Sequence, residues 1–175
     1  MNLYLLRHAS AGTRRANPAA DAKRSLDKEG KQQCLLVGRY LSAARVQFDL
    51  IVSSPLKRAL QTASLVGTEV AYDARFVVDE SMSPAASAAS FLDLVHRLSH
   101  YDNVLVVGHN PNLPQFLGAL INVSGRSSIR LRKGAIARVD CGALPGQLHS
   151  LIEPRTLRQI YASVARSSRR KTSRK

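Results

Sequence analysis

The 175-residue chain is poor in aromatic residues and in cysteines, and each shortage excludes a class of protein. It contains no tryptophan, and aromatic residues make up 5% of it, too few for the interleaved rings of a base-stacking surface. Its two cysteines, Cys34 and Cys141, lie far apart and outside any C-x-x-C pair, so zinc-binding and thioredoxin-like classes find no support. We expect both thiols to pack as small hydrophobic groups in a reducing compartment.

Long hydrophobic runs are also missing. The apolar start of the chain, residues 1–6, is too short for a signal peptide and is interrupted at Arg7. No other stretch approaches the roughly 20 apolar residues that a membrane-spanning helix needs. The sequence therefore predicts a soluble, cytoplasmic protein with no membrane partner.

Acidic residues are scarce, with 12 Asp and Glu against 26 Lys and Arg, which gives a formal net charge of +14. Such an excess of bases is typical of proteins that bind nucleic acid. Six of the bases lie in residues 166–175, and without them 20 bases against 12 acids leave +8. We expect a domain over 1–165 and a disordered tail over 166–175, able to add only weak, salt-dependent binding of nucleic acid.

What is present is a regular alternation of short apolar runs with segments of helical period. A chain of this length fits one domain, and the alternation predicts an α/β fold with a mostly parallel sheet flanked by helices on both faces. We expect strands over 2–6, 50–52, part of 70–78 and 104–107, then a C-terminal hairpin of 136–139 and 148–152.

The helices are expected between these strands, after a polar loop over 10–25. Asp27 is suited to cap the first helix, and a serine before Pro55 to cap the second, with Pro55 as its first helical residue. Further helices are predicted around 91–98, from Pro111 onward and over 155–165.

Unusual polar residues follow three of the predicted strands: Arg7-His8, the segment 54–63 with Arg58, and the segment 107–111 with His109. Open α/β sheets bind ligands at the carboxyl ends of their strands, so these groups would converge if the strands are neighbours. Two guanidiniums match phosphate oxygens, helix N-termini favour anions, and a neutral imidazole is a competent nucleophile toward phosphorus without any metal. Taken singly, each feature is also typical of a strand end, a surface charge or a helix cap.

The ordered motifs R-H-A, S-P-x-x-R-A-x-Q-T-A and V-G-H-N-P resemble those of the histidine phosphatase superfamily, also called phosphoglycerate-mutase-like. The resemblance runs from residue 2 to about residue 120. The short chain, R-H-A in place of R-H-G, and the segment 21–26 before a helix with Gly30 resemble the SixA-type phosphohistidine phosphatase branch.

The resemblance implies a role for each motif residue. His8 would accept the phosphoryl group and form a phosphohistidine intermediate that water hydrolyses. Arg7 and Arg58 would bind the phosphoryl oxygens, and His109 would stabilise charge in the transition state. Arg24 falls where this branch often has a further arginine near the pocket. No metal and no cofactor are implied.

Glu80 is a candidate for the general acid that protonates the leaving group in many relatives, and the alternative is a solvated loop residue. Ser10 and Ser25 also depart from the residues common in relatives, away from the core chemistry. A phosphoramidate substrate tolerates the absence of an acid, because its P–N bond is labile and its imidazole leaving group is readily protonated.

The resemblance implies a metal-independent phosphatase that acts on phosphohistidine, on a histidine phosphotransfer protein in signal transduction. The alternative enzyme is a phosphatase for small phosphate esters or nucleotides. A binding module for nucleic acid or acidic membranes and a catalytically inactive relative are two further alternatives. The sequence leaves the oligomeric state open.

Overall fold

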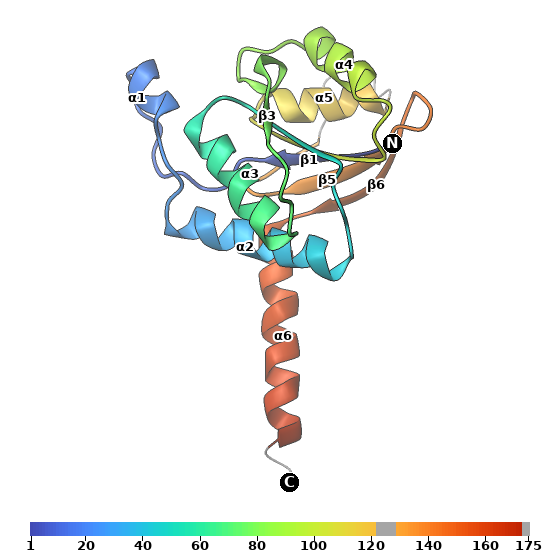
Figure 1. Ribbon diagram of the computed structural model, residues 1–175. Coiled ribbons are helices and arrows are strands. Elements are labelled where there is room, and N and C mark those ends of the chain that lie inside the picture. Colours follow the sequence, from blue (N-terminus) through green and yellow to red (C-terminus); the bar gives the residue numbers. More distant parts are fainter. Residues whose placement is uncertain (122–128, 173–175) are drawn as a thin grey trace.

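A six-stranded mixed sheet with helices on both faces forms the body of the protein (Figure 1). The computed structural model describes residues 1–121 and 129–172, with side chains described as far as residue 164. The strand order is β3-β2-β4-β1-β5-β6. The strands are β1 (Asn2–Arg7), β2 (Leu50–Ser53), β3 (Val77–Val78), β4 (Asn103–Gly108), β5 (Ile136–Asp140) and β6 (Gln147–Ile152).

The parallel part of the sheet runs from β3 to β1, and β5 and β6 form an antiparallel hairpin beside β1. The predicted α/β class, the mostly parallel sheet and the C-terminal hairpin are therefore confirmed. β3 is only two residues long and both of its valines are exposed.

The helices are α1 (Pro18–Ala22), α2 (Lys28–Ala43), α3 (Lys57–Glu69), α4 (Ala88–Arg97), α5 (Asn112–Leu120) and α6 (Pro154–Thr172), with a short 3-10 helix, η1 (Glu80–Met82). Among the described residues, no helix is both long and apolar enough to cross a bilayer. Cys34 is buried and Cys141 is half-buried, and both are unbridged.

Two apolar layers hold the helices against the sheet. Leu3 and Leu5 of β1 belong to the layer under α4 and α5, whereas Tyr4 and Leu6 belong to the layer under α2 and α3. Successive side chains of a strand point to opposite faces, so a strand covered on both faces must be apolar throughout. This explains why β1 and β4 are near-continuous apolar runs.

Three local predictions differ from the structure. The predicted loop over 10–25 contains helix α1, whose cap is Asn17, with the side-chain oxygen accepting from the N–H groups of Ala19 and Ala20. Asn-Pro is a helix-start signal that the sequence analysis missed. Helix α3 begins at Lys57, and its N-cap residue Leu56 offers no side-chain cap. The Ser54 hydroxyl oxygen accepts from the Leu56 N–H at 3.3 Å, just before the helix, and lies 2.8 Å from His109 Nε2.

Helix α6 extends to Thr172, past the predicted end at residue 165 and into the predicted disordered tail. Arginine and lysine are good helix formers, so a helix already begun can continue along them without burying an apolar face. Residues 173–175 of the predicted tail lie outside the described residues. In Figure 1, α6 leaves the body of the protein as a single projecting helix.

Candidate active site

The three predicted strand ends meet at one edge of the sheet. β4 lies between β2 and β1, with Arg7 paired to Gly108 and Ser53 paired to Val107. The backbone continues this alignment, because the N–H of His8 donates to the Gly108 carbonyl at 3.0 Å. As a result the rings of His8 and His109 lie side by side, with centroids 4.9 Å apart.

The hydrogen bonds of His8 determine which of its ring nitrogens is available. Nδ1 lies 2.8 Å from the Ala9 carbonyl, which can only accept, so Nδ1 carries the proton. In the neutral ring Nε2 then has a lone pair, and Arg58 Nε donates to it at 3.3 Å. Burial, followed by the charges of Arg58 and Arg7, lowers the pKa of His8 to about 3, so the ring is neutral at ordinary pH.

Arg58 lies in the first turn of α3 and is held from two sides. Besides its contact with His8, its Nη1 donates to the backbone carbonyl of Asp21 at 3.0 Å and to the Asp21 carboxylate at 3.2 Å. Burial lowers the pKa of Arg58, with a further contribution from the charge of Arg24. The guanidinium is therefore buried and oriented beside the nucleophile candidate.

Asp21, in α1, is a site residue that the sequence analysis did not single out. Its carboxylate also accepts from Arg24 Nε at 2.9 Å, so it joins Arg24 to Arg58. Hydrogen bonds from the Arg15 N–H and from Arg24 lower the pKa of Asp21 to about 2, which keeps it ionised. Arg24 itself donates to the carbonyls of Ala11 and Gly12. Its link to the site is the ion pair with Asp21, which in turn contacts Arg58.

Three buried polar atoms at this edge have no hydrogen-bond partner among the described residues: Arg7 Nε, His109 Nδ1 and Asn110 Oδ1. Arg7 Nη1 and Asn110 Nδ2 both donate to the Leu131 carbonyl, each at 2.9 Å. Buried polar atoms are almost always paired, so exceptions gathered at one place indicate a site for a polar ligand.

His109 is hydrogen-bonded to the loop that follows β2. Its Nε2 is 2.8 Å from the Ser54 hydroxyl. Burial, with added repulsion from His8 and Arg58, lowers the pKa of His109 to about 2. Both imidazoles are therefore neutral, and the arginines supply the positive charge of the site.

Thr62 ties the loop after β1 to helix α3. Its hydroxyl oxygen accepts from the Ala9 N–H at 3.1 Å and the hydroxyl donates to the Arg58 carbonyl at 2.7 Å. These two hydrogen bonds link the backbone beside His8 to the turn that carries Arg58. Thr62 belongs to the Q-T-A motif. It lies four residues after Arg58, about one helical turn along the same face of α3, and this spacing could have indicated its place beside the site.

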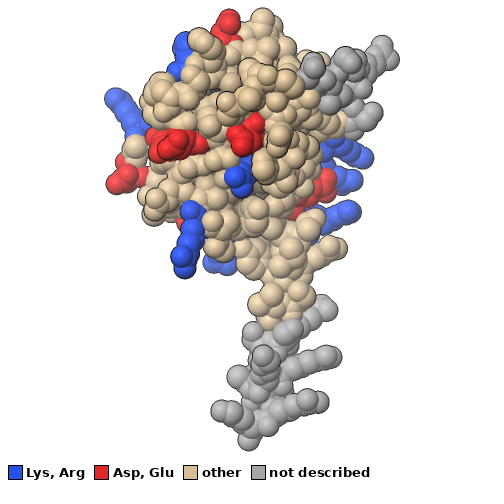
Figure 2. Space-filling model, turned by 90° about the vertical axis from the view of Figure 1, so that its right-hand side faces the viewer, with Lys and Arg blue, Asp and Glu red and all other residues tan. Residues whose placement is uncertain are grey.

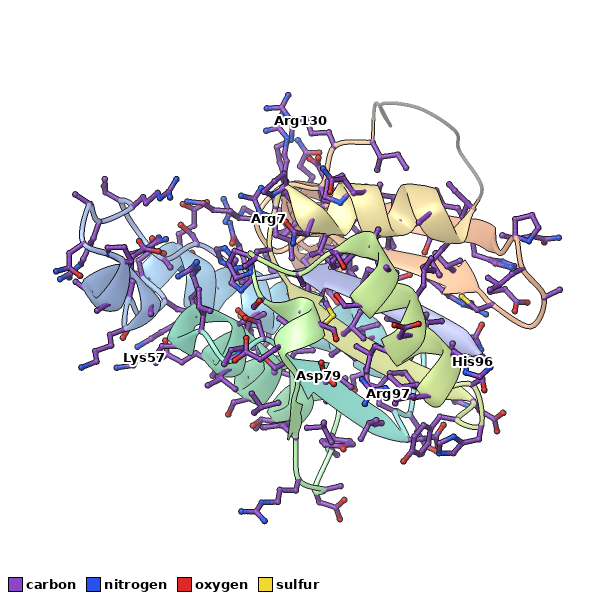
Figure 3. All side chains as sticks on the ribbon, turned by 90° about the horizontal axis from the view of Figure 1, so that it is seen from above. Arg7, Lys57, Asp79, His96, Arg97 and Arg130 are labelled. Carbon is purple, nitrogen blue, oxygen red and sulfur yellow. The ribbon has the colours of Figure 1, made fainter. Side chains whose placement is uncertain are left out.

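Glu80 lies at the start of η1 and is exposed. Within the described part of the chain, no hydrogen bond or ion pair joins its carboxylate to Arg7, His8, Arg58 or His109. The neighbouring Asp79 caps η1 through the Ser81 N–H and pairs with Arg97 at 3.0 Å (Figure 3). A general-acid role for Glu80 stays a prediction.

Together these groups form a polar cluster suited to a tetrahedral oxyanion, with two guanidiniums and the unprotonated Nε2 of His8. In the described ranges, no cluster of three His, Cys, Asp or Glu side chains could hold a metal ion. Guanidinium groups can bind phosphoryl oxygens in pairs and neutralise their charge.

Comparison with known proteins points to one family. The model of the histidine phosphatase superfamily (branch 1) matches residues 3–83. An uncharacterized protein from Picosynechococcus sp. is 31% identical over 153 residues, which cover 86% of this chain and 91% of the relative.

Two solved structures have the same fold. The protein histidine phosphatase SixA, complexed with tungstate, aligns with a TM-score of 0.80 and 23% identity, over 90% of this chain and 99% of that one. A SixA-type protein from Agrobacterium tumefaciens aligns with a TM-score of 0.73 and 25% identity, over 87% and 97% of the two chains. The chain belongs to the histidine phosphatase superfamily, and its fold is that of the SixA-type branch.

Proposed function

We propose that this protein is a phosphohistidine phosphatase that works through a covalent phosphohistidine intermediate on His8. The observation that carries the proposal is the orientation of the His8 ring, with Nδ1 bonded to the Ala9 carbonyl and Nε2 unprotonated beside Arg58. A histidine nucleophile needs a neutral ring, a fixed tautomer and nearby charge to receive the phosphoryl oxygens. All three requirements fit this site.

In the first step the lone pair of His8 Nε2 attacks phosphorus, and the bond from phosphorus to the substrate nitrogen breaks. Arg7 and Arg58 bind the phosphoryl oxygens, whose charge they balance. The substrate imidazole leaves with the bonding electron pair on its nitrogen. Because its other ring nitrogen carries a proton, it leaves as neutral imidazole and needs no acid from the protein.

In the second step a water molecule attacks phosphorus and the bond to His8 Nε2 breaks. The electron pair returns to Nε2, the water proton passes to phosphate or solvent, and inorganic phosphate leaves. His8 is then again the neutral Nδ1–H tautomer, still bonded to the Ala9 carbonyl. The hydrogen bond to Ala9 holds the ring in one orientation through both steps.

The choice of phosphohistidine over phosphate esters rests on the leaving group. An alkoxide needs a proton donor, and among the described residues only the carboxylate of Asp21 contacts any of the four side chains, at Arg58. Asp21 is close, but its pKa of about 2 and its bonds to Arg24 and Arg58 make it a fixed anion. A P–N bond to a protonated imidazole is a substrate that such a site can cleave.

Turnover of phosphohistidine by the wild type, His8→Ala and His149→Ala tests the proposal. We expect His8→Ala to lower kcat at least about a thousandfold, since the nucleophile is lost. His149 is exposed on β6, so His149→Ala is the matched control and should keep full activity. Rapid quenching at alkaline pH should trap labelled phosphate on the wild type and not on His8→Ala. Hydrolysis of small phosphate esters without hydrolysis of phosphohistidine would overturn the proposal.

Glu80→Gln separates the two substrate classes. We expect turnover of phosphohistidine to change less than about twofold, because the leaving imidazole already carries its proton. Steady-state assays of phosphohistidine and of a phosphate ester panel provide the measurement. A loss of about tenfold or more on phosphohistidine would make Glu80 the general acid.

A further inference from the structure

A cavity of about 430 Å³ opens beside the phosphate-binding groups, and Arg7 and Asn110 form part of its wall. The rest of the wall comes from the segment before β5, from the first turns of α2 and from the start of α6. In Figure 3, Arg130 lies beyond Arg7 on the same side of the molecule, while Asp79 and Arg97 lie on the opposite side. The cavity therefore continues outward from the site already described.

The wall of this cavity is strongly basic. Besides Arg7 it contains five bases, namely Arg130, Arg132, Lys133, Arg155 and Arg158. Figure 2 shows Lys and Arg side chains gathered along one edge of the body above α6, with an acidic side chain among them. We call this cavity, with the six bases of its wall, the basic cavity.

The carboxylates of the basic cavity leave most of these bases unneutralised. Glu153 pairs with Arg132 at 3.2 Å, and Glu29 accepts a hydrogen bond from Gln33 at 3.1 Å. Among the described residues, which include every Asp and Glu of the chain, no carboxylate lies within 4 Å of the other four bases. Positive side chains that a fold leaves together and unpaired create a local potential that attracts anions.

We propose that the basic cavity is a docking site for acidic side chains that surround the phosphohistidine on a protein substrate. The inference rests on the proposed function, since it names the surface that receives the rest of that substrate. Apart from Arg7, the bases of the cavity have no role in the phosphoryl chemistry proposed above. Arg155 and Arg158 belong to α6 and contact none of the four site side chains.

The arrangement of the bases favours an acidic protein surface over a small anion. Arg130, Arg155 and Arg158 are exposed, and they come from two different segments. Exposed charges spread over an open wall suit several solvated carboxylates at once, whereas a small anion needs buried, converging donors. Complementary charge of this kind speeds association and sets orientation.

The first test compares Arg158→Glu with Arg75→Glu on a phosphorylated histidine phosphotransfer domain that has acidic residues around its histidine. Arg75 is exposed and precedes β3, at the edge of the sheet opposite the β5–β6 hairpin, so it gives the same change of charge elsewhere. At low ionic strength we expect kcat/KM to fall about tenfold for Arg158→Glu and to stay unchanged for Arg75→Glu.

Two substrates serve as controls for this test. With free phosphohistidine, or with the phosphotransfer domain after its flanking acids are changed to amides, Arg158→Glu should match the wild type. Equal effects of Arg158→Glu and Arg75→Glu, or an equal loss on free phosphohistidine, would overturn the docking site and leave the proposed function standing.

A binding measurement makes the docking site independent of catalysis. A fluorescein-labelled hexaglutamate peptide is titrated with the wild type, Arg158→Glu, Arg155→Glu and Arg75→Glu, and its anisotropy is followed. We expect the two cavity variants to bind about fivefold more weakly than the wild type and Arg75→Glu. If the wild type hydrolyses no phosphohistidine, the proposed function fails, and this titration still decides the docking site. Equal binding by all four proteins would overturn it.

Discussion

At the residue scale, Arg58 is held by partners from two other segments of the chain. Its Nε contacts His8, and its Nη1 contacts both the carbonyl and the carboxylate of Asp21. The carboxylate thus acts as a positioning group for a phosphate-binding candidate. Arg24, on the other side of Asp21, fixes the carboxylate in turn.

Asp21→Ala removes the carboxylate contact of Arg58 and leaves its Nη1 only the backbone carbonyl of residue 21, so the guanidinium is held less firmly beside His8. We expect kcat/KM to fall about tenfold, because small misplacements of a binding group are costly in the transition state. Asp73→Ala is the matched control, since Asp73 is exposed in the loop before β3. Kinetics with the two variants, together with their far-ultraviolet circular dichroism, provide the measurement. Unchanged kinetics for Asp21→Ala would show that Arg58 needs no carboxylate.

At the element scale, the loop after β1 is held by the first turn of α2. The Ser10 hydroxyl donates to the Asp27 carboxylate at 2.8 Å, and the same carboxylate caps α2 through the Gly30 N–H at 2.7 Å. Gly30 approaches the Ser10 backbone so closely that a Cβ on Gly30 would lie 2.0 Å from the Ser10 carbonyl oxygen. The backbone two residues from the nucleophile candidate therefore depends on this glycine.

The direction in which Gly30→Ala changes the free energy of unfolding tests this close approach. Helix propensity alone would stabilise α2 by about 1 kcal/mol, because alanine is the better helix former. The contact with the Ser10 carbonyl reverses this, and we expect the free energy of unfolding to fall by about 2 kcal/mol. Urea unfolding followed by circular dichroism checks it, with Ser42→Ala on the exposed side of α2 as control. A stabilised Gly30→Ala would contradict the close approach.

At the scale of the whole molecule, the two buried histidines couple stability to pH. The pKa of His8 is lowered to about 3 and that of His109 to about 2, both from an ordinary value of 6.5. Below about pH 6.5 the unfolded chain takes up protons that the folded protein does not, so the unfolded state gains stability. The free energy of unfolding must then decrease as the pH falls toward 3.

Urea unfolding between about pH 7 and about pH 4.5 measures this decrease, which amounts to at most about 1.4 kcal/mol per pH unit for each histidine. Circular dichroism is the suitable signal, because the chain has no tryptophan. His8→Asn should flatten the dependence, while His149→Asn, at an exposed position, should not. A stability that stays constant over this range would mean that the two rings are not held neutral.

The distribution of charge is a second property of the whole molecule. A chain that ends at residue 165 has a formal +8 in place of +14. We expect it to bind DNA more weakly and with a smaller dependence on salt, because six bases are removed. It should keep its phosphatase activity, because all four site side chains lie before α6. Titration of a labelled duplex at several salt concentrations measures the first property. DNA binding that is unchanged by the truncation would place the binding surface on the body instead.

The class of fold and the polar groups at the strand ends could be predicted from the sequence alone. Continuous apolar runs over β1 and β4, and the helix periods between strands, are local patterns that need no knowledge of neighbours. The convergence of Arg7, His8, Arg58 and His109 was predicted on the condition that the three strands are neighbours, and the strand order β2-β4-β1 meets it.

The groups that surround these four side chains could be found only once the chain was folded. The pairing of Asp21 with Arg58, the unpaired atoms of Arg7 and Asn110, and the basic cavity all join residues that lie far apart in the chain. Nothing in the local pattern around Asp21 or Arg158 marks them, since a charged side chain in a polar segment is the ordinary surface of a protein. Their roles arise because sheet order and helix packing bring separate segments within hydrogen-bond or Coulomb range, which no periodicity along the chain encodes.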